Sequence, residues 1–193
     1  LSRFALVVFA TTATGFPVAA QSYPYRTGSW TADSFGNHRV VVSVAKGGPA
    51  VAVDIAWRRP DLCPQSKGVW IVSARTGERV RNVAIRSLTR EAGIIVFEPV
   101  DGPGEYYVYY MRYTGTVASS YPKITYPGPD STAEPKWLRE HALHFDLGST
   151  RVVAFEAADS LDSFYPMQVI ATATETSQVL ARSPGKPFLV FPE

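Results

Sequence analysis

Short apolar runs separated by turn residues dominate the first two thirds of the chain. They predict strands at residues 38–44, 51–57, 69–74, 79–85, 93–99 and 105–113. Gly-Gly-Pro at residues 47–49 is typical of a tight turn, and we expect the strands on either side of it to form a hairpin. Because turn signals recur about every ten residues, the pattern predicts a mainly β fold, an antiparallel β-sandwich.

The strand at residues 105–113 is unusually rich in tyrosine. Alternation along a strand divides its side chains into two sets: Tyr106, Val108, Tyr110 and Arg112 on one face, and Tyr107, Tyr109, Met111 and Tyr113 on the other. Both sets are largely apolar, which favours a central strand covered on both faces over a platform on which sugar rings stack. We therefore expect these tyrosines to lie in the core, with their hydroxyls bonded at its edge.

From residue 121 the pattern changes. Residues 121–137 contain four prolines and form a long irregular segment, a length that suggests a functional loop. Pro135 is expected to open a short helix through residue 143, with Asp130 or Ser131 as candidate caps. A strand is predicted at residues 151–157, a helix between about residues 162 and 182, and a last strand at residues 186–191. The fold class thus includes one or two short helices in the C-terminal third.

The first twenty residues have the composition of a secretory signal. Arg3 precedes a short apolar run, and Val18, Ala19 and Ala20 supply a small-residue cleavage site. The run is too short to span a bilayer, so we expect a secreted or periplasmic protein with no membrane span. Residues 22–193 are expected to form one domain. Since the chain stops at Glu193 directly after an apolar run, we expect this domain to be truncated before a catalytic barrel.

Composition narrows the function classes. The formal net charge is only +2 and no long run of Lys and Arg occurs, which argues against a nucleic-acid partner. Aromatic residues make up 12% of the chain, which favours a β-rich or carbohydrate-facing protein. The single cysteine, Cys63, excludes an internal disulfide.

Catalytic and metal-binding motifs are not found. His141 and His144 are three residues apart, whereas a zinc protease helix needs two histidines at i and i+4 with a glutamate between them. Cys63 lies in a proline-flanked loop, and the chain has neither a G-x-S-x-G elbow nor a glycine-rich phosphate loop. The acidic group at residues 98–105 reads as a solvated Pro/Gly turn. We expect no catalytic residue, no metal and no cofactor.

Aromatic residues beside planar polar groups are the candidate ligand-binding sites. Trp57 is followed by Arg58 and Arg59 at a predicted strand end, where a sandwich presents its loops. Tyr121, Tyr126 and Trp137 lie in the long loop and could form a second patch. A tryptophan at a strand end also fills a core in many proteins, so the structural role stays open for each.

Several segments together resemble a known family. FGNHRVVVSV, VDIAWRRPD, ARTGERVRNV, GIIVFEPVDGPGEYYVYY, FEAADSLDSFYPMQVIAT and KPFLVFPE are similar to the N-terminal region of bacterial proteins related to glycoside hydrolase family 123. The resemblance spans residues 29–193 and implies a secreted enzyme with a β-sandwich ahead of a (β/α)₈ barrel.

The resemblance also implies an activity whose catalytic residues are not recognised in this chain. Members of that family act on β-linked N-acetylgalactosamine by a substrate-assisted mechanism, in which adjacent Asp and Glu residues of the barrel assist the 2-acetamido group. This sequence has no adjacent Asp-Glu pair and no βα repeat, so no catalytic residue can be assigned.

Two main hypotheses follow. The first is a non-catalytic β-sandwich that contacts a catalytic domain, meets glycan through the parent enzyme and adds one wall of the sugar cleft through residues 121–137. The alternative is a free-standing secreted carbohydrate-binding module. A self-contained enzyme is a third, weaker hypothesis.

Overall fold

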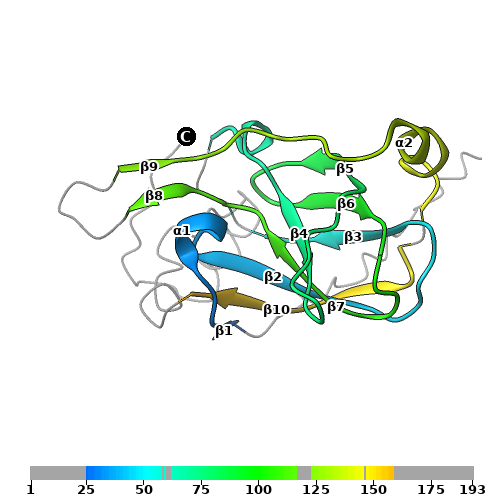
Figure 1. The fold of residues 1–193 in the computed structure, drawn as a ribbon, viewed down its shortest axis with the longest axis horizontal. Coiled ribbons are helices and arrows are strands. Elements are labelled where there is room, and N and C mark those ends of the chain that lie inside the picture. Colours follow the sequence, from blue (N-terminus) through cyan, green and yellow to red (C-terminus); the bar gives the residue numbers. More distant parts are fainter. Residues whose placement is uncertain (1–24, 58, 60–61, 117–122, 146, 159–193) are drawn as a thin grey trace, which may run out of the picture.

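The chain folds into two β-sheets packed face to face (Figure 1). A computed structural model describes residues 25–57, 59, 62–116, 123–145 and 147–158. The mainly β sandwich expected from the sequence is confirmed. The signal at residues 1–20 and the helix and strand predicted beyond residue 158 lie outside the described residues.

The larger sheet has five strands in the order β1–β10–β2–β7–β4. Their bounds are β1 Tyr25–Thr27, β2 His38–Val44, β4 Trp70–Ser73, β7 Gly104–Tyr109 and β10 Thr150–Ala157. Neighbouring strands are antiparallel except β1 and β10, which are parallel.

The smaller sheet has three antiparallel strands in the order β3–β6–β5. They are β3 Val51–Ile55, β5 Val83–Leu88 and β6 Gly93–Phe97. The remaining elements are the ribbon of β8 Thr114–Thr116 with β9 Lys123–Thr125, the helices α1 Ala32–Phe35 and α2 Pro135–His141, and a 3₁₀ turn at Pro64–Ser66. The short helix predicted from Pro135 is confirmed, whereas α1 was not predicted.

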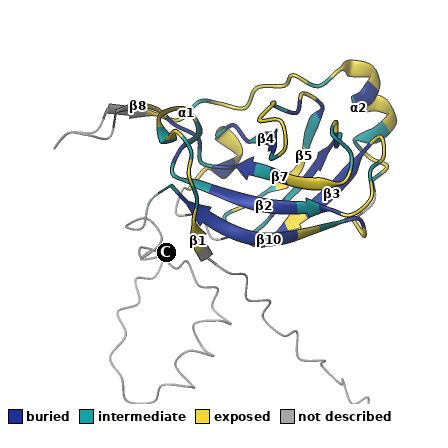
Figure 2. Cartoon of the chain, turned by 60° about the horizontal axis from the view of Figure 1, so that its bottom comes forward, coloured by how far each residue is buried: buried dark blue, intermediate teal, exposed yellow. Residues whose placement is uncertain are grey.

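The main core lies between the two sheets. Alternate β-branched residues of β2 face those of β3: Val40, Val42 and Val44 on one side, and Val51, Val53 and Ile55 on the other. Burial of each such side chain stabilises the fold by about 1.5–3 kcal/mol. Figure 2 shows β2 and β10 largely buried along their length, as a sheet covered on both faces requires.

The predicted hairpin between residues 38–44 and 51–57 is wrong. β2 pairs with β10 and β7, whereas β3 pairs with β6 in the other sheet, so the Gly-Gly-Pro connection crosses from one sheet to the other. The reason is that both strands are strongly apolar and bury their side chains in the same core from opposite sides. A turn does form around Gly77, which has φ 74°, and Val72 and Arg79 form a bridge across it.

The tyrosine-rich strand is central, as predicted. β7 lies between β2 and β4, and Tyr106 and Val108 point into the main core. Tyr107 and Tyr109 lie on the opposite, outer face of the sheet. Arg112 departs from the prediction that it shares the face of Tyr106, because the strand ends at Tyr109 and the alternation ends with it.

A second, smaller core covers the outer face of the three-stranded sheet. Trp137 of α2 packs on Ala50, Ala52 and Val96, and its indole Nε1 donates a hydrogen bond to the Pro49 carbonyl at 2.8 Å. Neither predicted cap is used at the start of α2. The N-cap is Glu134, which makes no side-chain cap bond, and its backbone N–H donates to Asn82 Oδ1 at 2.8 Å.

One row of polar and aromatic side chains crosses the outer face of the five-stranded sheet. Arg26 on β1, Glu156 on β10 and Arg39 on β2 are direct cross-strand neighbours. Nε of each arginine donates to the Glu156 carboxylate at 2.6 Å. Arg39 also donates to the Tyr109 hydroxyl at 2.9 Å, which links β2 to β7. Tyr109 faces Trp70 on β4, so the row reaches all five strands.

Arg39 is held in its charged form by this row. Burial by itself would lower the pKa of Arg39, but its hydrogen bonds to Tyr109 and Glu156 outweigh burial and raise the pKa. Its guanidinium carbon lies 3.5 Å from the ring centre of Tyr107 and 4.4 Å from that of Trp30. The buried charge is therefore compensated by a carboxylate and two aromatic rings.

Replacing Arg39 with Gln is expected to lower the free energy of unfolding by about 3 kcal/mol, because it breaks a buried ion pair. The matched control is Arg26→Gln, on the same carboxylate. The Arg26 side chain is 48% exposed against 8% for Arg39, and its loss should cost below about 1 kcal/mol. Urea unfolding of both variants measures the difference, and equal losses would contradict the role assigned to Arg39.

Replacing Gly93 with Ala is expected to lower the free energy of unfolding by about 1–3 kcal/mol. An added Cβ would lie 2.3 Å from Cζ2 of the buried Trp57, so the indole would have to move. Gly48→Ala is the control, because a Cβ there meets no atom within 4 Å, and its effect should stay within about 0.5 kcal/mol. Indistinguishable thermal unfolding of the two variants would rule out the packing of Trp57 on Gly93.

Candidate functional site

Two residues of the first predicted patch, Trp57 and Arg59, are buried. Trp57 is 2% exposed, stacks on Tyr110 at 5.0 Å and donates from Nε1 to the Thr89 carbonyl at 2.9 Å. Arg59 is fully buried, with its guanidinium carbon 5.2 Å from the Trp57 ring centre. Arg58 lies outside the described residues. Trp57 therefore has the structural role that the sequence left open, because its large apolar ring lies in the core.

The second predicted patch is divided. Tyr126 is 39% exposed and lies 4.2 Å beneath the ammonium group of Lys67. Trp137 is a buried residue of α2. Figure 1 shows α2 and β9 at opposite ends of the segment that connects them, so Trp137 lies far from the β9 end, where Tyr126 is found. Tyr121 lies outside the described residues. Only Tyr126 thus remains as a described, exposed member of the predicted set, and its role in ligand binding stays a prediction.

A groove lies beside the segment that follows Tyr126. Its volume is about 120 Å³; its apolar residues are Val69, Val83, Ile85, Leu88 and Pro129, and its polar residues are Gln65, Lys67, Arg79, Asp130 and Thr132. We call it the edge groove, because β4 and β5 are edge strands of their sheets. An apolar surface beside a few polar groups is the general pattern of a small-molecule site.

Hydrogen bonds hold the 127–132 segment in place as one wall of the edge groove. The backbone N–H of Gly68 donates to the Pro127 carbonyl at 2.9 Å, and Thr132 Oγ1 donates to the Arg81 carbonyl at 2.8 Å. A Cβ on Gly68 would lie 2.8 Å from the Gly128 carbonyl oxygen, so only glycine permits this approach. The wall is therefore fixed to the sandwich at both ends.

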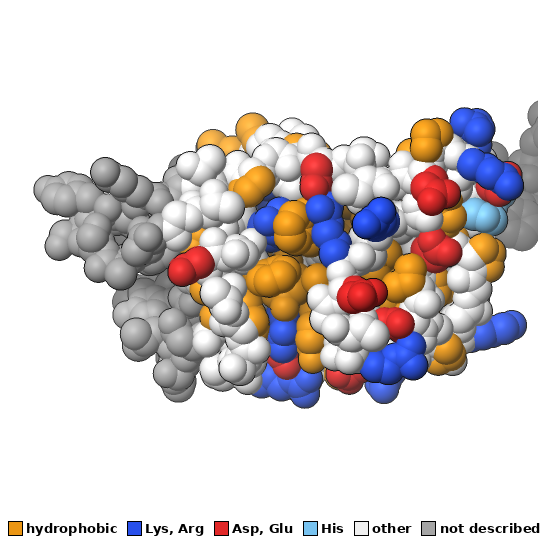
Figure 3. Space-filling view, in the orientation of Figure 1, with side chains coloured by type: hydrophobic (Ala, Val, Ile, Leu, Met, Phe, Trp, Pro, Cys, Tyr) orange, Lys and Arg blue, Asp and Glu red, His pale blue; other side chains and the backbone are white. Residues whose placement is uncertain are grey.

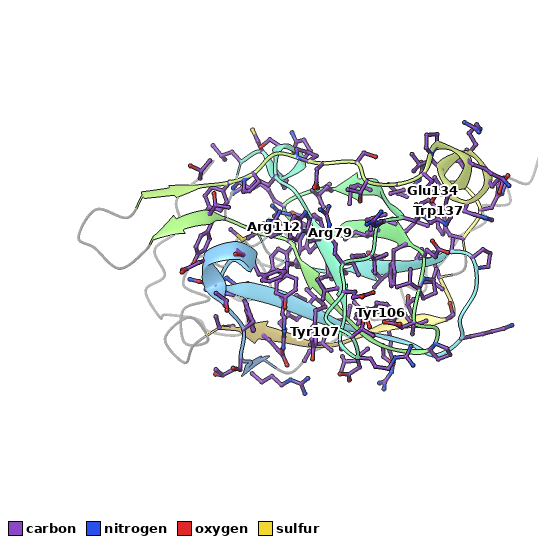
Figure 4. The ribbon with its side chains drawn as sticks, in the orientation of Figure 1. Arg79, Tyr106, Tyr107, Arg112, Glu134 and Trp137 are labelled. Atoms are coloured by element: carbon purple, nitrogen blue, oxygen red, sulfur yellow. The ribbon has the colours of Figure 1, made fainter. Side chains whose placement is uncertain are left out.

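Next to the edge groove, Trp70 lies between two arginines. The guanidinium carbons of Arg79 and Arg112 lie 3.9 and 3.1 Å from its ring centre. Two such groups cannot share one ring face without overlapping, so they occupy opposite faces. Figure 4 shows Arg79 and Arg112 close together near β4, and Figure 3 shows basic side chains beside hydrophobic ones at the centre of this face.

The two arginines repel each other across the ring. The centroid distances place their guanidinium carbons at most about 7 Å apart, and like charges at that separation repel by about 2 kcal/mol at an effective dielectric constant of about 20. Burial first, and then the charge of Arg79, lowers the pKa of Arg112. The Nε of Arg112 donates to the Ser34 carbonyl at 3.1 Å.

Asp130 offsets part of this positive charge. Its carboxylate accepts from Arg79 at 2.8 Å and from the Trp70 indole at 3.2 Å. Partial burial works to raise the pKa of Asp130, but the hydrogen bond and charge of Arg79, with the bond from Trp70, lower it overall. The Arg79–Asp130 pair thus presents planar donors and acceptors at the groove, a combination suited to sugar hydroxyls.

Neither a cluster of metal-ligating side chains nor a membrane-spanning helix is found in the part of the chain that is described. Within residues 25–57, 59, 62–116, 123–145 and 147–158, no three His, Cys, Asp or Glu side chains come together in a way that could hold a metal ion. Over the same residues, no helix is long and apolar enough to cross a membrane.

Sequence reasoning missed the polar residues of the edge groove. Lys67, Arg79 and Asp130 are spread over more than sixty positions, and none of them belongs to a motif. The one available signal was the length of the proline-rich segment, which did predict a functional loop. That prediction indicated the wall of the groove but not the strands that face it.

Comparison with known proteins gives one match. A family model described as glycoside hydrolase 123, N-terminal domain, matches residues 28–158. Neither the curated proteins nor the solved structures contain a match to the chain.

Titration of Asp130 is expected to move the indole N–H signal of Trp70 in NMR spectra. Because the pKa of Asp130 is lowered, its ion pair with Arg79 is complete above pH of about 4 and is lost as the pH falls through the lowered pKa. The transition should be absent in Asp130→Asn. A midpoint at or above the ordinary value for aspartate would contradict the pairing.

Proposed function

Because the chain belongs to the glycoside hydrolase 123 N-terminal domain family, we propose that it is the non-catalytic β-sandwich of a secreted or periplasmic carbohydrate-active enzyme. In this role it supports a catalytic barrel that acts on β-linked N-acetylgalactosamine. Catalysis belongs to that barrel, and no residue of this chain is assigned to it.

The coincidence between the family match and the fold is the observation that carries the proposal. The matched residues, 28–158, cover nearly the whole described sandwich, from just after β1 to the end of β10. This part has its own core between two sheets and a second core under α2. A unit with its own core is the usual form of an accessory domain joined to a catalytic one.

The edge groove is the surface through which this domain would contact sugar. Its apolar residues suit the C–H face of a sugar ring, and the Arg79–Asp130 pair suits its hydroxyls. Tyr126, exposed beneath Lys67, adds an aromatic ring on the segment that forms the groove wall. We therefore propose the 126–132 segment as one wall of the sugar cleft in the parent enzyme.

A free-standing carbohydrate-binding module is the alternative function. The same groove and Tyr126 favour it, because neither needs a second domain to bind a glycan. The two functions differ in whether the complete gene product hydrolyses a glycoside.

Hydrolysis of aryl glycosides, including the β-N-acetylgalactosaminide, tests the proposal. The purified chain is expected to release no aryl group above the buffer rate, and the complete gene product is expected to release it from the galactosaminide. Hydrolysis by the chain alone, in proportion to protein concentration, would show a self-contained enzyme and overturn the proposal. An inactive complete product that binds glycan would favour the alternative.

A further inference from the structure

We propose that the sugar bound in the edge groove carries an anionic substituent, either a carboxylate or a sulfate ester. This inference rests on the proposed function, in which the groove contacts glycan, and it adds the chemical class of the ligand. Its basis is an excess of positive charge at one place in the fold.

The excess lies in the groove and directly behind it. The groove itself presents two cations, Lys67 and Arg79, and one carboxylate, Asp130. Arg112 adds a third cation on the far face of Trp70. Two guanidinium groups thus lie over the Trp70 ring with one carboxylate beside them, so positive charge exceeds negative charge at this place.

Two buried arginines on the same face of the sheet show how unusual this arrangement is. Arg39 and Arg112 are 7% and 6% exposed, which makes an uncompensated charge costly at either position. Arg39 has the Glu156 carboxylate at 2.6 Å. Arg112 has the Ser34 carbonyl and the Trp70 ring, and no ion pair joins it to a carboxylate within the described residues.

Asp130 does not make up this difference. Its hydrogen bonds go to Arg79 and Trp70, whereas Arg112 donates to the Ser34 carbonyl and makes no direct bond to this carboxylate. Consistent with this, the pKa of Arg112 is lowered while that of Arg39 is raised. A second anion placed at the groove would complete the compensation.

The groove also suits such a ligand in its shape. The Arg79 side chain is 27% exposed, and a guanidinium matches the planar oxygens of a carboxylate or sulfate. The apolar residues Val69, Val83, Ile85 and Leu88 would lie against the sugar ring itself. The anion would thus contact Arg79 and Lys67 directly, and the charge of Arg112 would act from behind Trp70.

Calorimetric titration of the purified chain tests the ligand class. The probes are a hyaluronan hexasaccharide, which carries carboxylates only, a sulfated chondroitin hexasaccharide, neutral chitohexaose, and inorganic sulfate. At least one anionic hexasaccharide is expected to bind ten-fold or more tightly than chitohexaose, with an affinity that falls as salt is added. The hexasaccharide that binds more tightly identifies the substituent.

Three variants locate the binding. Arg79→Gln should lower the affinity for the anionic hexasaccharide at least ten-fold. Asp130→Asn should strengthen binding of the anionic hexasaccharide several-fold, since the repelling charge is removed while the amide oxygen can still accept from Arg79. A gain in affinity cannot come from misfolding, so this variant remains informative if Arg79→Gln is unstable. Arg26→Gln makes the same change in net charge at β1 and should leave binding unchanged.

Four results would overturn the inference. Equal binding of chitohexaose would identify a neutral-sugar groove, and no binding of any hexasaccharide would exclude a glycan site. If inorganic sulfate bound as tightly as the sulfated hexasaccharide, the groove would be a site for anions only and not for sugars. Equal weakening by Arg26→Gln and Arg79→Gln would indicate non-specific attraction. Absence of all binding would also remove the groove from the proposed sugar cleft, whereas the hydrolysis assay tests the enzymatic role of the parent protein separately.

Discussion

Burial of β2 and β7 on both faces is the constraint on which the rest of the structure depends. Their inner faces pack against the three-stranded sheet through β-branched and aromatic side chains. No further sheet packs on their outer faces among the described residues, so side chains must cover these faces. That cover consists of Trp30, Phe35 and the row of side chains from Arg26 to Trp70.

Charged residues can serve as part of this cover because each is matched to its surroundings. Glu156 holds Arg26 and Arg39, and aromatic rings lie against the guanidinium of Arg39. A buried ion pair is stabilising only when hydrogen bonds satisfy both partners, and here they do. At the β4 edge of the same face the matching is incomplete, because Asp130 pairs directly with Arg79 but among the described residues no carboxylate forms an ion pair with Arg112. The row therefore covers the sheet at the β1 end, and at the β4 end it lies beside the edge groove, which is the candidate binding surface.

The edges of the two sheets explain where the groove lies. An edge strand leaves backbone groups unpaired, and natural sheets cover or irregularly twist such edges. β5 has a register irregularity between Ile85 and Ser87, and the 127–132 segment runs past the β4 side, bonded to Gly68 and Arg81. Covering an edge with a proline-rich segment in this way creates a wall, and the space beside it becomes the groove. Protection of the sheets and formation of a site therefore have the same structural cause.

The sequence by itself determined most of the local strands, the helix that begins at Pro135 and the sandwich class. His38–Val44 and Pro135–His141 follow from β-branched runs and from proline at a helix start, which are preferences of neighbouring residues. The central position of the tyrosine-rich strand was also predicted from the sequence, because a strand that is apolar on both faces must be covered on both faces. Tertiary structure alone decided which strands pair, because two apolar strands joined by a turn fit equally well as a hairpin or as a crossing between sheets. It also decided that Trp57 is buried and that Asp130 joins Arg79 and Trp70, since these contacts span up to sixty residues and depend on how the sheets pack.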